Sequence, residues 1–143
     1  ISAGGIETPA IEEFFEAIPN RWTISNPDHG KSWDIAPFGS TTDSTCAMFR
    51  GYNYSNTGEL DDLISPNYSL DSNSLLVYDI AYRQKIGSNS DTLNVFVSDN
   101  CGISWNILQN FIMMQMDLLL QVRIKPMHLL PQTNPIGEVI LFH

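Results

Sequence analysis

Residues 74–105 read SLLVYDIAYRQKIGSNSDTLNVFVSDNCGISW and carry the clearest strand pattern of the chain. Two runs rich in apolar residues are joined by the turn sequence GSNSD at 87–91. Successive side chains of a strand point to opposite faces, so every second residue shares a face. The shared faces are Leu76, Tyr78, Ile80 and Tyr82 in the first run, and Leu93, Val95 and Val97 in the second. Both runs are therefore predicted to be strands.

The other face of the first run is also apolar. It carries Leu75, Val77 and Ala81. An apolar residue at nearly every position is typical of a strand covered on both sides. The pattern therefore predicts a central strand.

Outside this stretch, short apolar runs alternate with turn clusters such as NPDHG at 26–30, GSTTDS at 39–44 and SLDSNS at 69–74. A turn signal every 8–12 residues or so is the spacing of a β-sandwich or barrel. The sequence thus predicts an all-β fold.

The net charge of the chain argues against some classes of binding partner. The chain has 16 acidic against 7 basic residues, a formal net charge of −9. It offers no basic stripe to neutralise phosphates, which argues against nucleic-acid binding. No long apolar run is free of charged or amide side chains, which argues against membrane insertion.

Composition also suggests how the chain is divided. Residues 1–10, ISAGGIETPA, suit a linker or the tail of a preceding module. Residues 11–110 are expected to form one sandwich domain, and 111–143 a tail of different character. We expect the chain to be covalently part of a larger exported protein whose signal peptide lies upstream.

Five motifs occur in an order that resembles the cleaved-adhesin or choice-of-anchor J family of MAM-like jelly-roll modules. They are FFEAIPNRW (14–22), NPDHGKSW (26–33), DDLISP (61–66), YDIAYR (78–83) and SDTLNVFVSDNCGISW (90–105). The resemblance covers about residues 13–108. It implies a jelly-roll-like antiparallel β-sandwich, and the family's closing strands have no visible counterpart, so the sandwich is expected to be incomplete at the C-terminus.

The same resemblance implies a non-catalytic binding or adhesion module, secreted or displayed at the cell surface, whose partner is a host protein, a matrix protein or a glycan. Two alternatives stay open: a structural spacer that stabilises an attached protease, and a carbohydrate-active enzyme. The enzyme is the weaker alternative. Glu12/Glu13 and Asp61/Asp62 are adjacent pairs, and neighbours on a strand point to opposite faces rather than flanking one bond.

Calcium binding is a better explanation of the acidic residues than glycoside hydrolysis, because calcium prefers six to eight oxygen ligands from carboxylates, amides and the backbone. The candidate ligands are Glu16, Asp28, Asp61 and Asp62. Members of the resembled family often carry structural calcium. Solvated acids on a negative surface are the alternative interpretation.

Cys46 and Cys101 are the two cysteines of the chain. In an exported protein they are expected to form one disulfide, which would stabilise the fold by about 4 kcal/mol in the chain-entropy model. The alternative is a buried free thiol.

Trp33, Tyr52 and Tyr54 lie in or beside polar loops, where exposed rings would stack on sugars or peptides. They are the candidate ligand-binding residues. Packing in the core is the alternative for each of them.

The tail differs in composition from everything before it. Residues 106–131 contain no Gly, Ser, Thr, Ala or Tyr, and methionine recurs at 113, 114, 116 and 127. Read one base earlier, the codon pairs 113–114, 114–115, 116–117 and 127–128 must encode Asp, Ala, Gly and Ala. We therefore predict that 111–143 is a frameshifted continuation of the domain that packs poorly or turns helical. Sequencing the gene across codons 105–115 tests this.

Overall fold

The computed structural model describes residues 5–7, 10–11, 14, 17–37, 45–51, 54, 58–70, 74–84, 90–114, 116–126 and 136–142. These residues contain twelve strands and no α-helix. The strands are β1 (Ile6–Glu7), β2 (Ala10–Ile11), β3 (Thr23–Ser25), β4 (Trp33–Ala36), β5 (Cys46–Arg50), β6 (Asp62–Ile64), β7 (Tyr68–Leu70), β8 (Ser74–Gln84), β9 (Ser90–Ser98), β10 (Asn106–Met114), β11 (Met116–Pro126) and β12 (Ile136–Phe142). The described part of the chain holds no helix long and apolar enough to cross a membrane.

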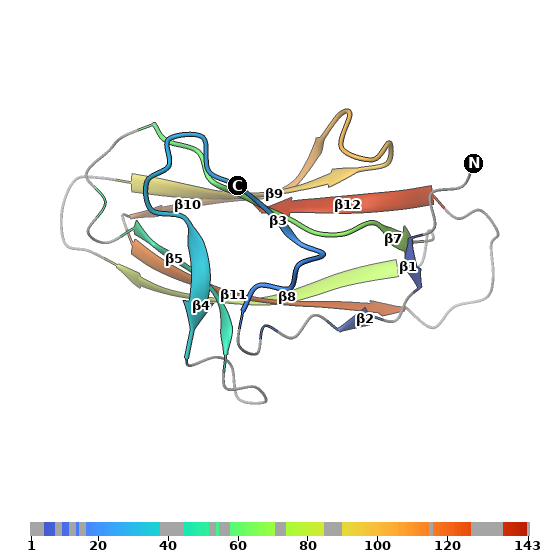
Figure 1. Ribbon diagram of the computed structural model, residues 1–143, viewed down its shortest axis with the longest axis horizontal. Helices are drawn as coiled ribbons and strands as arrows, with labels where there is room; N and C mark the ends of the chain where they lie inside the picture. The colour runs from blue at the N-terminus through green and yellow to red at the C-terminus, as the bar shows by residue number, and fades with distance from the viewer. Residues whose placement is uncertain are drawn as a thin grey trace.

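The strands form two sheets that lie in two layers (Figure 1). The seven-stranded sheet is organised around β12, which pairs with β9 on one edge and with β6 and β7 on the other. Strands β6 and β7 are separated by a segment containing Pro66, which cannot donate to a ladder. Strand β3 extends this sheet beyond β6, β1 extends it beyond β7, and β10 extends it beyond β9.

The five-stranded sheet is organised around β11. Strand β8 pairs with β11 along its whole length, and β5 and β2 pair with successive parts of the opposite edge. Strand β4 pairs antiparallel with β5 and completes the sheet. All pairings in this sheet are antiparallel, so the predicted all-β antiparallel sandwich is confirmed.

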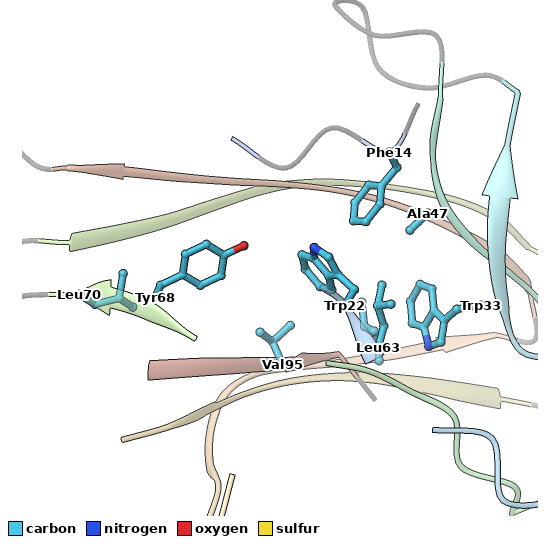
Figure 2. Packing of buried hydrophobic residues seen from close by; sticks show 9 residues of the cluster. Phe14, Trp22, Trp33, Ala47, Leu63, Tyr68, Leu70 and Val95 are labelled. Atoms are coloured by element: carbon cyan, nitrogen blue, oxygen red, sulfur yellow. The ribbon is translucent and has the colours of Figure 1, made fainter. Parts of the chain in front are cut away.

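The core lies between the two sheets (Figure 2). Its buried residues are Phe14, Trp22, Trp33, Ala47, Leu63, Tyr68, Leu70, Leu93 and Val95. Figure 2 shows the Trp22 ring centrally, between Leu63 and Tyr68. The rings of Phe14 and Trp22 meet edge to face, with centroids 5.3 Å apart, which is a favourable arrangement for aromatic pairs.

The alternation predicted in residues 74–98 is confirmed on one face. Leu76, Tyr78 and Ile80 pack against the core, and Leu93 and Val95 belong to it. The prediction of a central strand covered on both sides is wrong. Among the described residues β8 pairs with β11 alone, so it is an edge strand whose outer face exposes its apolar residues. Leu75 on that face is 47% exposed.

The expectation that residues 111–143 turn helical is wrong for the part of that range that the structure describes, which forms strands. The expectation that they pack poorly stays a prediction. Strands β11 and β12, which come from this region, occupy the inner positions of the two sheets. The sequence LQVRIK at 120–125 of β11 alternates apolar and polar residues, which is the pattern of a strand rather than of a helix. Whether the reading frame is shifted stays a prediction.

The N-terminal segment predicted as a linker supplies β1 and the first residue of β2. Strand β1 lies parallel to β7, with Ile6 opposite Tyr68. A side chain at Gly5 would place its Cβ 2.7 Å from the backbone nitrogen of Ser69, so only glycine allows this close approach.

Candidate functional site

Two of the predicted calcium ligands are brought together by the pairing of β3 with β6. In that ladder Ser25 lies opposite Asp62, so the loop that follows β3 runs beside the residue that precedes β6. We name the group formed there the Asp61 cluster, defined as Asn26, Asp28, Ser32, Tyr54 and Asp61.

The loop that begins the cluster is a tight turn fixed by its own residues. The backbone nitrogen of His29 donates to the Asn26 carbonyl (3.3 Å), and His29 has a positive φ of 55°. The Gly30 nitrogen donates to Asp28 Oδ1 (2.9 Å). A Cβ on Gly30 would lie 2.5 Å from Asp28 Oδ2, so a larger residue here would displace the Asp28 carboxylate.

Two aromatic side chains hold the carboxylates in place. The Tyr54 hydroxyl donates to Asp28 Oδ2. The Trp33 indole Nε1 donates to the backbone carbonyl of Asp61 (3.2 Å) and so fixes the start of β6. Tyr54 is steadied in turn by Phe49, whose ring meets its own edge to face at 6.5 Å.

Three buried oxygens of the cluster have no hydrogen-bond donor among the described residues: Asn26 Oδ1, Ser32 Oγ and Asp61 Oδ1. Asn26 is oriented by its other amide atom, because Nδ2 donates to the Gly30 carbonyl (3.2 Å). A buried oxygen without a donor costs free energy unless another positive group satisfies it. The cluster therefore presents oxygen atoms that lack a positive partner.

The electrostatics of Asp61 point the same way. Asp61 is 8% exposed, and burial raises its pKa above the ordinary value. Proximity to Ser32 lowers the pKa of Asp61, although the hydroxyl does not reach hydrogen-bond geometry. The negative charges of Asp28, Asp62 and Glu59 raise the pKa of Asp61 further. An ionised Asp61 therefore lacks compensating charge.

The Asp61 cluster provides some of the oxygen ligands that a hard cation such as calcium requires. Asp28 and Asp61 contribute carboxylates, and Asn26 and Ser32 add the neutral oxygens that calcium accepts. Asp62 adds negative charge beside Asp61, and Glu16 lies outside the described residues. The described residues contain no group of three Asp, Glu, His or Cys side chains that could hold a metal by themselves.

A second notable region is the turn between β9 and β10, residues 98–105, which we call the hairpin tip. It projects from the body of the sandwich (Figure 1). Ser98 Oγ donates to Asn100 Oδ1 (2.9 Å) and accepts from the Gly102 nitrogen (2.7 Å). Asn100 Oδ1 also accepts from the Ser104 nitrogen (2.9 Å), and Asn100 Nδ2 donates to Ser104 Oγ (2.7 Å).

This hydrogen-bond network holds an apolar side chain in solvent. Ile103 is 85% exposed, and its nitrogen donates to the Asn100 carbonyl (3.4 Å). Ile107 and Leu108, just beyond the tip, are 56% and 52% exposed. Trp105 is half-buried. The tip therefore combines a fixed backbone with exposed apolar surface.

The predicted disulfide is absent, since neither Cys46 nor Cys101 is in a disulfide. Cys46 lies in β5 and is buried in a small cluster with Ala36 and Met48. Cys101 is exposed at the hairpin tip, which belongs to the other sheet, where its Sγ accepts from Asn67 Nδ2 (3.9 Å). The two thiols are thus held in different environments of the sandwich.

The difference in burial predicts how the two thiols react. Burial raises the pKa of Cys46, which suppresses its reactive thiolate, whereas Cys101 is open to solvent. We expect a thiol-alkylating reagent to add one label to the native protein and a second one only after denaturation. Mass spectrometry counts the labels, and Cys101→Ser is the control that should remove the native label. If the denatured, unreduced chain takes up no label, both thiols are blocked and the prediction of a disulfide is supported instead.

The two candidate ligand-binding aromatics that the structure describes, Trp33 and Tyr54, do not form an exposed platform. Trp33 is 6% exposed, because β4 directs this residue and Ile35 toward the core between the sheets. Tyr54 is half-buried and supports Asp28. Tyr52 lies outside the described residues.

Sequence reasoning missed Asn26, Ser32 and Ile103. The first two stand in the loop sequence NPDHGKS around Asp28, where an amide and a hydroxyl two and four residues from a carboxylate were a usable signal. Ile103 was visible as an apolar residue inside a turn cluster. Its exposure followed only from the hydrogen-bonded tip.

Comparison with known proteins agrees with the fold. No protein-family model matches the chain, and no curated protein matches it. Among solved structures, the chain is similar to the K3 cleaved adhesin domain of Lys-gingipain from Porphyromonas gingivalis w83. The two superpose with a TM-score of 0.56 over 92% of this chain and 94% of that domain, at 12% sequence identity. At this identity the likeness concerns the fold, and it links this sandwich to that of an adhesin domain.

Proposed function

We propose that this chain is a non-catalytic adhesin-type module of a larger secreted or cell-surface protein, and that it binds a host protein, a matrix protein or a glycan. The observation that supports the proposal most is the shared fold with a cleaved adhesin domain over nearly the whole chain. Fold alone does not specify function, so the proposal also needs a surface suited to binding.

The hairpin tip is the surface we assign to this role. An exposed apolar side chain on a fixed backbone loses little conformational entropy when it enters a pocket. Ile103 meets both conditions, because it is 85% exposed and the tip is closed by hydrogen bonds within residues 98–104. The acidic chain, with a net charge of −9, favours a partner whose pocket is bordered by basic groups.

We further propose that calcium is a structural cofactor of the module, held at the Asp61 cluster by Asn26, Asp28, Ser32 and Asp61. Bound calcium would supply positive charge to the buried oxygens that lack a donor. Asp61 and Asn26 would orient it, and Trp33 would keep the Asp61 backbone in place. This role is structural and is independent of the ligand at the tip.

Truncating Ile103 tests the binding role. The full chain, Ile103→Ser and the control Ile24→Ser are measured against arrays of matrix proteins and glycans, followed by titration of each hit. Ile24 is 40% exposed on β3 and lies outside the tip. We expect Ile103→Ser to weaken binding roughly tenfold or more, as for a central interface residue, and Ile24→Ser to have little effect. Equal affinities for the two variants would remove the tip from the proposal, and no binding by the full chain would favour the spacer role.

A further inference from the structure

Sheet edges are the places where a β-sandwich can accept another strand, because their backbone groups lack a partner. In the described part of the chain, the edge strands β1, β2, β3 and β4 have two to four residues each. Strands this short offer little to a partner. Two edge strands are long: β8 with eleven residues and β10 with nine.

The two long edges differ in charge. Strand β8 contains Asp79 and Arg83, and charged residues on an edge discourage pairing with another chain. Strand β10, NILQNFIMM, has no charged residue and no proline. Within the described residues it pairs with β9 alone, and Asn106 to Asn110 are all exposed. Strand β10 is therefore the long edge without protection.

We propose that β10 pairs antiparallel, edge to edge, with β10 of a second copy of this chain. Two copies that each carry a net charge of −9 repel one another over most of their surfaces. An uncharged strand is the place where they approach at the lowest electrostatic cost. The exposed Ile107 and Leu108 add apolar area beside the new ladder. This inference does not depend on the adhesin role of the tip.

The side chains of β10 suggest the register. Asn110, the middle residue of the strand, donates its amide Nδ2 to Asn94 Oδ1 on β9. An asparagine amide both donates and accepts, so it can pair with its own copy across a twofold axis. With Asn110 opposite Asn110 of the second copy, the Asn94–Asn110 pair becomes a continuous asparagine ladder, which is a recurring stabilising feature of stacked strands. The twofold arrangement also makes the interface self-complementary and closed.

The interface is small. A nine-residue strand pair with two flanking apolar residues lies at the low end of specific interfaces, below about 1,200 Å². We therefore expect a reversible dimer with a dissociation constant in the micromolar range, on the order of 10–100 µM. A contact between two different surfaces of the chain would allow further copies to add without limit, whereas the twofold β10–β10 contact closes at two copies.

Sedimentation equilibrium of the full chain from about 1 to 500 µM covers concentrations below and above the expected dissociation constant of the dimer. Asn110→Lys would place two ammonium groups face to face at the twofold axis, and we expect the dissociation constant to rise at least tenfold. Leu75→Lys introduces the same charge on the outer face of the other long edge strand, β8, and should leave the dimer unchanged. Circular dichroism and the thermal midpoint of both variants show that each is folded.

A chain that stays monomeric across this range overturns the proposal, even if it captures a strand from another protein. Equal weakening by the two lysine variants also overturns it, because the effect would then come from charge in general. Assembly beyond two copies would contradict the closed register. Ile103→Ser should leave the dimer intact, so a failure of this inference is distinguishable from a failure of the adhesin role.

Discussion

Millimolar calcium is expected to raise the thermal midpoint of the wild-type chain by roughly 5–10 °C, the effect of a ligand present at about a hundred times its dissociation constant. The reason is the buried Asp61 carboxylate, whose Oδ1 has no hydrogen-bond donor and whose neighbours include other acids. Asp61→Asn should abolish the gain, because it removes the charge on which the cation depends. Differential scanning calorimetry with and without a chelator measures both proteins.

The same substitution has the opposite effect without calcium. Burial raises the pKa of Asp61 above its unfolded value, so the folded state binds the proton more tightly than the unfolded one does. The stabilising contribution is fully present below the unfolded pKa and is lost as the pH rises through the folded pKa. At pH 7 the ionised carboxylate therefore costs stability, and Asp61→Asn should melt at the wild-type temperature or above it in chelator.

Asp79→Asn is the matched control, because Asp79 is exposed on β8. It should leave the calcium response unchanged. The calcium site would be disproved by a wild-type midpoint that does not move at millimolar calcium, or by an equal response in Asp61→Asn.

Trp22→Ala is expected to cost about 3–5 kcal/mol of unfolding free energy, as large-to-small changes of buried aromatic residues do. Trp22 is 5% exposed and meets Phe14 edge to face in the middle of the core. Domains of this size are stable by only about 5–15 kcal/mol, so the variant should be close to unfolding at room temperature. Urea titration of the wild type and the variant gives the difference.

Ile103→Ala removes an apolar side chain that is 85% exposed, and it should change stability by less than about 0.5 kcal/mol. Comparing Trp22→Ala with Ile103→Ala separates the effect of burial from that of hydrophobicity, because both residues are apolar but only Trp22 is buried. A loss below about 1 kcal/mol in Trp22→Ala would mean that the core does not close around this ring.

The strands that could be predicted were those with a period of two and clear turns on both sides. Leu76, Tyr78 and Ile80 alternate with residues of the opposite face, and the turn sequence GSNSD separates this strand from β9. The central place of β11 could not be predicted, because the alternation of LQVRIK at 120–125 indicates a strand but not which strands pair with it. The edge position of β8 depended in turn on β11, its only partner among the described residues.

At the site, the spacing of residues identified Asp28 and Asp61 but could not give their surroundings. Trp33 was expected among exposed rings because polar residues flank it, yet β4 directs it inward to reach Asp61. Cys46 and Cys101 were paired by elimination, and no local pattern revealed that they belong to different sheets. Contacts between segments that are distant in the sequence determine where Trp33 and the two cysteines lie. Such contacts cannot be predicted from a local sequence pattern.

The inner places of β11 and β12 also determine when this protein can fold during its synthesis. The strands that flank β12, namely β6, β7 and β9, leave the ribosome before β12 does, and β11 likewise follows β2, β5 and β8. Neither sheet can join its two halves until these late segments emerge. Such long-range pairing is slow, and the nascent chain meanwhile exposes the edges of β8 and β9 to solvent and to other chains. Cellular factors that shield nascent chains, or slow export of the unfolded chain, would therefore decide the yield of this protein more than the stability of its finished core.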